Sequence, residues 1–89
     1  MEFSVRPAPF DPHADGNTAT RWENWVSDFE IILIAAAVTV DIRKRALLLN
    51  CAGQEVVEIF RSLSDVGPSY DDAKKSFVLL FRASKKYII

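Results

Sequence analysis

The chain has 89 residues, a hydrophobic fraction of 49% and a formal net charge of −1. These values fit one small globular domain, exclude a disordered chain, and provide no overall positive charge for binding a polyanion. Its single cysteine excludes an internal disulfide, and one Cys with one His cannot complete a four-ligand structural zinc site. We therefore expect an intracellular, cytoplasmic protein that holds no cofactor.

No segment resembles a membrane span. The longest apolar stretch, residues 31–38, has only eight residues, whereas a spanning helix needs about 20. The first six residues lack the apolar core of a signal peptide, and no small-residue cleavage site follows them. We expect no membrane contact.

Residues 1–19 are predicted to form an extended, Pro-rich N-terminal arm. Pro7, Pro9 and Pro12 each restrict φ, remove a backbone donor and push the preceding residue toward extended conformations. The arm also carries Phe10, an apolar side chain that can dock in a groove of its own domain or of a neighbour. A frayed terminus is the alternative.

Residues 20–84 are predicted to form a compact four-helix domain. The first helix is expected from Arg21 to about Ala37, because Thr20 and Glu23 match the S/T-x-x-E capping box. Its apolar residues recur at helical spacing on one face: Trp22, Trp25, Val26, Phe29, Ile32, Leu33 and Ala36.

The second and third helices are expected to meet at a glycine. Asp41 is a good N-cap for a helix over residues 42–52, and the later turns of this helix are apolar all round, which predicts a buried, central position. Gly53 can end that helix, so that the third one runs from about Gln54 to Leu63.

A loop over residues 64–68 precedes the fourth helix. Ser69 is its expected cap, and two aspartates in the first turn complement the helix dipole. Residues 85–89 form a connector or tail. Because the chain shows no alternation of period two and no internal repeat, the fold class is predicted to be all-α.

Residues for catalysis are scarce. A Cys–His nucleophilic pair would need Cys51 beside His13. Cys51 lies in the most apolar helix, where a cysteine is most simply a small buried hydrophobe, and His13 lies in a turn. The chain also lacks a glycine-rich phosphate loop. We expect a protein that is not an enzyme.

The run Arg43-Lys44-Arg45 is the best candidate for contact with nucleic acid. Positive charge in the first turn of a helix opposes its dipole, so local stability does not explain this run. The plainer interpretation is a solvated turn with local ion pairs, and the second and third helices show no polar recognition face.

Some apolar residues lie on the wrong side of their helices. Ile31 and Ile34 project from the polar face of the first helix, and Leu79 from that of the fourth. Several exposed apolar residues together indicate a contact surface. With Phe10 they form our candidate interaction surface, and coverage by the N-terminal arm or by the tail is the equal alternative.

From about residue 9 to residue 89, the chain resembles the N-terminal lobe of the capsid domain of a gypsy-type LTR retrotransposon Gag protein. No single matching element is specific, but the ordered set is. It comprises Pro9-Phe10-Asp11, Trp22-x-x-Trp25-x-x-x-Phe29, Ala35-Ala36-Ala37-Val38-Thr39, Arg43-Lys44-Arg45-Ala46-Leu47-Leu48-Leu49, Ala52-Gly53, Ile59-Phe60, Tyr70-Asp71-Asp72-Ala73 and Phe81.

This resemblance implies a helical lobe without catalytic activity. In that family the lobe packs against other lobes to build a capsid shell or, in domesticated relatives, binds peptide segments. The chain departs from the pattern at Val40, where relatives often carry a polar or acidic residue, and it includes neither the second capsid lobe nor a Cys-x-x-Cys-type zinc knuckle.

Three functions follow, in order of preference. The first is a capsid-type lobe that binds copies of itself or other Gag-type lobes. The second is an adaptor of the same fold that binds short apolar or Pro-containing peptides. The third is a nucleic-acid-binding domain centred on Arg43, Lys44 and Arg45, although this domain alone offers little charge for it.

Overall fold

The computed structural model describes residues 7–14 and 16–83. In this part of the chain four helices and no strand are found, so the predicted all-α class is confirmed. The predicted connector or tail at residues 85–89 lies outside the described residues. The helices are α1 (Thr18–Ala35), α2 (Asp41–Ala52), α3 (Gln54–Ser62) and α4 (Tyr70–Ala83).

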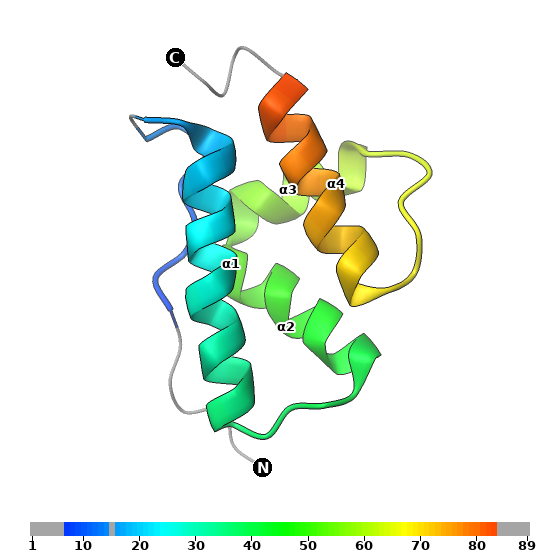
Figure 1. The fold of residues 1–89 in the computed structure, drawn as a ribbon. Coiled ribbons are helices and arrows are strands. Elements are labelled where there is room, and N and C mark those ends of the chain that lie inside the picture. Colours follow the sequence, from blue (N-terminus) through cyan, green and yellow to red (C-terminus); the bar gives the residue numbers. More distant parts are fainter. Residues whose placement is uncertain (1–6, 15, 84–89) are drawn as a thin grey trace.

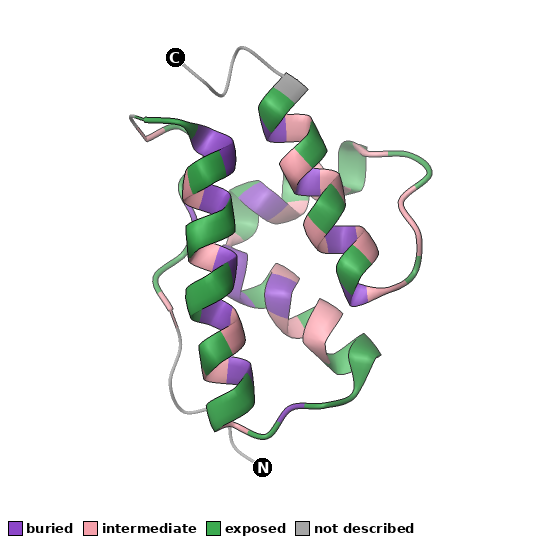
Figure 2. Cartoon of the chain, viewed as in Figure 1, coloured by how far each residue is buried: buried purple, intermediate pink, exposed green. Residues whose placement is uncertain are grey.

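The helices form one compact bundle around an aromatic core. Figure 1 shows α1 alongside α4, with α2 crossing below α4 and α3 behind, and α2 contacts both α3 and α4. The buried residues of α1 lie on the side turned toward the other helices (Figure 2). The largest side chains without exposed surface are Trp22, Phe29, Phe77 and Phe81.

Helix α1 begins earlier than the sequence predicted. The helix is capped by Asn17 and not by Thr20. The Asn17 side chain accepts a hydrogen bond from the backbone N–H of Thr20 at 3.0 Å. The predicted capping box at Thr20 is therefore wrong. Thr18 and Ala19 become the first helical residues and are buried, and asparagine caps a helix better than threonine does.

The end of α1 also differs from the prediction. Ala36 is the C-cap, and Ala37 adopts a left-handed backbone with a φ of 58°. Its N–H donates to the carbonyl of Ile34, and that of Val38 donates to the carbonyl of Leu33. These bonds satisfy carbonyls of the last turn, and the helix ends at Ala35 rather than near Ala37.

Asp41 does not cap α2, which corrects a second prediction. It is the first residue of that helix, and the N-cap position, occupied by Val40, makes no side-chain hydrogen bond. Gly53 separates α2 from α3 as expected, with a φ of 105° and a ψ of 170°. This region of the backbone is essentially restricted to glycine.

Ser69 caps α4, as predicted. The backbone N–H of Asp72 donates to the Ser69 hydroxyl at 3.0 Å, and the backbone N–H of Ser69 donates to the Asp72 carboxylate at 3.1 Å. The two residues therefore form a reciprocal capping box at the end of the loop that connects α3 to α4. The hydrogen bond from the Ser69 backbone holds the pKa of Asp72 below its usual value.

Candidate interaction surface

The apolar residues that the sequence placed on polar helix faces are exposed. Ile31 and Ile34 on α1 keep 63% and 78% of their surface accessible, and Leu79 on α4 keeps 67%. Exposure follows from helix geometry, because Phe29 and Leu33 occupy the opposite side of α1 and are buried.

Two further exposed residues were not predicted from the sequence. Val40 is 59% exposed and Ile42 is 73% exposed. Both flank Asp41, where the chain passes from α1 into α2, and Figure 1 shows the end of α1 and the start of α2 at the same end of the molecule. One signal could have found them, since apolar β-branched residues on either side of a helix start have few core neighbours.

We call Ile31, Ile34, Val40 and Ile42 the α1–α2 corner. Arg43 lies beside it and lines, with residues 36–40, a shallow pocket at the connection of the two helices. Leu79 lies elsewhere, where α4 and the loop over residues 63–67 line another hollow. The four apolar residues of the corner thus come from two helices and their connection, and several exposed apolar residues together indicate a contact surface.

Phe10 lies in the core rather than on the surface, which corrects its place on the predicted interaction surface. Only 6% of it is accessible. Its ring centroid lies 5.2 Å from that of Trp22 and 5.7 Å from that of Phe81, and the Arg21 guanidinium lies 5.3 Å from it. Burial of a large aromatic ring removes much apolar surface from water, so Phe10 contributes to the hydrophobic core of its own domain.

Hydrogen bonds to its backbone atoms hold the segment around Phe10 in place. Its N–H donates to the carbonyl of Ala52 at 3.0 Å, at the end of α2. The Trp25 indole N–H donates to the Ala8 carbonyl at 2.8 Å, and the Arg21 guanidinium donates to the carbonyls of Asp11 and Ala14, each at 2.9 Å. Residues 7–14 therefore dock on their own domain, while residues 1–6 of the predicted arm lie outside the described residues.

The basic run does not form a continuous patch. The Arg45 guanidinium donates to the carbonyls of Gly67 and Ser69 at 2.6 and 3.0 Å and stacks 5.2 Å from the Phe60 ring centroid. Arg43 is exposed and Lys44 is half-buried. Since Arg45 is engaged within the domain, the run offers less charge to a phosphate backbone than its sequence suggested.

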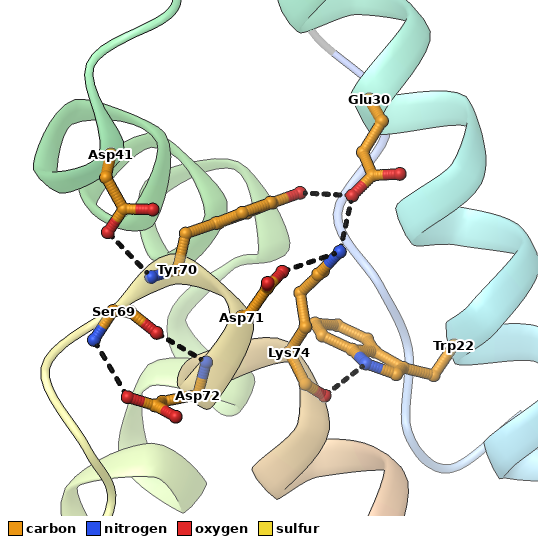
Figure 3. A network of polar contacts seen from close by, with 8 residues as sticks. All are labelled: Trp22, Glu30, Asp41, Ser69, Tyr70, Asp71, Asp72 and Lys74. Carbon is orange, nitrogen blue, oxygen red and sulfur yellow. Dashed lines mark hydrogen bonds and ion pairs between the residues drawn. The ribbon is translucent and has the colours of Figure 1, made fainter.

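A polar network ties α1 to α4 (Figure 3). The Tyr70 hydroxyl donates to Glu30 at 3.0 Å, and the Lys74 ammonium donates to the same carboxylate at 2.7 Å. Burial, with the charge of Glu30, raises the pKa of Tyr70 far above its usual value. Partial burial lowers the pKa of Lys74, but the bonds to Glu30 and Asp71 outweigh it and raise that pKa. Neither Tyr70 nor Lys74 therefore changes protonation near neutral pH.

Cys51 and His13 lie in different environments. Cys51 is buried in the core, whereas His13 is exposed and its Nε2 lies 2.9 Å from a carboxylate oxygen of Glu55. Over residues 7–14 and 16–83, no group of three or more His, Cys, Asp and Glu residues could hold a metal ion. None of the helices in this range is both long and apolar enough to cross a membrane.

Comparisons of this chain with family models, with curated proteins and with solved structures found no match.

Proposed function

We propose that this chain is a Gag-like capsid N-terminal lobe, without enzymatic activity, that acts by binding copies of itself through the α1–α2 corner. The observation that carries the proposal is the exposure of four large apolar side chains, which lie in the last turns of α1, in its connection to α2 and in the first turn of α2. The sequence resemblance supplies the family, since the order of its motifs fits a Gag capsid lobe, and the exposed corner supplies the contact.

The energetics of the corner favour a weak, concentration-dependent contact. Full burial of one Val or Ile side chain contributes about 1.5–3 kcal/mol, whereas association opposes this gain by about 4–15 kcal/mol of lost translational and rotational freedom. The four side chains are already partly covered in the single chain. Association is therefore expected in the micromolar to millimolar range, which suits lobes that assemble through several interfaces at once.

The test is the solution mass of the full chain against concentration, measured by light scattering after size exclusion. We expect the mass to rise above the 10.0 kDa of the monomer. Ile31→Glu with Ile34→Glu should abolish the rise, while Leu79→Glu, a matched change outside the corner, should leave it unchanged. A monomer at millimolar concentration would contradict the proposal, and circular dichroism should show that every variant keeps its helicity.

A second candidate, a peptide-binding adaptor, is favoured by the docking of residues 7–14. A non-helical segment held by hydrogen bonds to its backbone and by one aromatic anchor resembles a bound peptide. If the seat of Phe10 accepts other segments, a peptide with the sequence of residues 7–14 should bind Phe10→Ala protein and restore the tryptophan emission of the wild type. Absence of binding at millimolar peptide would remove this candidate.

A further inference from the structure

A groove of about 240 Å³ lies between α1 and α4, and the function proposed above makes no use of it. Trp22 and Val26 of α1 line it and are buried, and Val78 of α4 lines it from the other helix. Figure 3 shows the indole of Trp22 directed toward α4, where it donates to the Lys74 carbonyl at 3.4 Å. Sites for drug-sized ligands have about 300–1,000 Å³, so this groove suits a single ring with a short substituent.

Charged side chains also line the groove, and their pairing decides which charge a ligand meets. A Glu23 carboxylate oxygen lies 3.1 Å from the Arg82 guanidinium, and a Glu30 carboxylate oxygen lies 2.7 Å from the Lys74 ammonium. Lys75 lines the same groove and is exposed, and it takes part in none of the ion pairs found in the described part of the chain. Both acids therefore have a cation beside them, whereas the Lys75 ammonium is open to an anionic group.

From this arrangement we infer that the groove binds a small aromatic carboxylate, with its ring against Val26 and Val78 and its carboxylate on Lys75. Burial of the ring provides most of the binding energy, because an exposed ion pair adds little. The charge instead selects the class of ligand, since an amine of similar shape meets Lys75 as a like charge. The Ser27 hydroxyl lines the groove and can donate a hydrogen bond to the same carboxylate. The inference does not depend on self-association, because no residue of the α1–α2 corner lines the groove.

The test is an NMR titration of the full chain at neutral pH and low salt with three probes of similar shape. Phenylacetate is an anion, phenylacetamide is neutral and phenethylamine is a cation. We expect phenylacetate to shift the Trp22 indole N–H signal with a dissociation constant on the order of 1 mM, the amide to bind more weakly and the amine most weakly. The Trp25 indole N–H donates to the Ala8 carbonyl outside the groove, so its signal should move less and serves as the internal reference.

Three variants complete the test, and the rest of each spectrum shows whether the variant is folded. Lys75→Glu should weaken phenylacetate binding about fivefold and make phenethylamine the better ligand. Arg61→Glu, the same change at an exposed position of α3, should have no effect, and Ser27→Phe should block all three probes by filling the groove from an exposed position. Equal binding of the three probes, or equal effects of Lys75→Glu and Arg61→Glu, would overturn the carboxylate as the ligand. A Trp22 signal that does not move at about 10 mM phenylacetate, ten times the expected dissociation constant, would overturn the site itself.

Discussion

The carboxylate of Asp41, the first residue of α2, accepts a hydrogen bond from the backbone N–H of Tyr70, the first residue of α4, at 3.0 Å (Figure 3). The first N–H groups of a helix have no partner within it. Asp41 satisfies the N–H of Tyr70, which lies 29 positions further along the chain. The charge of Asp41 also complements the dipole of α4. The side chain therefore joins the start of α2 to the start of α4.

Removal of the Asp41 carboxylate should weaken this joint. Asp41→Ala is expected to lower the free energy of unfolding by about 1 kcal/mol, the typical contribution of a helix cap. The measurement is urea unfolding at a protein concentration below the range in which association is expected. Glu58→Ala on α3 is the control, because its carboxylate accepts a hydrogen bond from the exposed Gln54 side chain on the same helix. Equal stabilities of the two variants would contradict the capping role.

Gly53 should resist substitution for two separate reasons. Its backbone conformation is strained for any residue with a side chain, by about 1–3 kcal/mol. A Cβ at this position would also lie 3.0 Å from the Cβ of Pro9. Gly53→Ala should therefore lower the free energy of unfolding by more than Gly16→Ala, since Gly16 shares a positive φ of 103° but its Cβ would meet the Arg21 side chain at 3.7 Å. Thermal melts of the two variants provide the comparison.

Phe10 should contribute strongly to the stability of the folded domain. Truncation of a buried phenylalanine lowers stability by about 3–5 kcal/mol, and Phe10→Ala also opens the ring cluster formed with Trp22 and Trp25. We expect a large drop in the free energy of unfolding together with a red shift of tryptophan emission. A loss below about 1 kcal/mol would mean that the docked segment contributes little to stability.

Local patterns predicted the helices well because helix periodicity and core burial agree in this chain. The stripe from Trp22 to Leu33 and the cap at Ser69 depend on residues close together in the chain, which a sequence displays directly. The partner of Asp41 and the seat of Phe10 depend on contacts between distant segments. Those contacts exist only once the helices have packed, so no local pattern revealed them.

The candidate surface was predictable only in part for the same reason. Ile31 and Ile34 interrupt the polar face of α1, and helical periodicity shows this interruption directly in the sequence. Ile42 lies in the first turn of α2, whose later turns are apolar, so periodicity does not separate it from the core. Its exposure of 73% depends on α2 starting at the edge of the bundle.

Acid should weaken the cap of α4. Because the pKa of Asp72 lies below its usual value of 3.8 in the folded protein, its contribution to stability is complete above that value and is lost as pH falls through the lowered pKa. Asp72→Asn keeps an acceptor for the Ser69 N–H but removes the charge. The difference in unfolding free energy between the two proteins should therefore shrink as pH falls from about 5 to about 2. A difference that stays constant with pH would show that the charge contributes nothing.

Arg43 and Arg45 of α2 should differ in what they support. Arg45→Ala removes two hydrogen bonds to loop carbonyls and the contact with the Phe60 ring, and is expected to destabilise the fold by about 2 kcal/mol. Arg43→Ala removes a solvated charge and should change stability by less than about 0.5 kcal/mol.

The same pair of variants also separates folding from association. Because Arg43 flanks the α1–α2 corner, its removal should weaken self-association while the urea midpoint stays at the wild-type value. Arg45→Ala should lower the midpoint, and its association should follow the fraction of folded protein. If Arg43→Ala lowers the midpoint as much as Arg45→Ala does, Arg43 supports the fold and is not a solvated charge beside the corner.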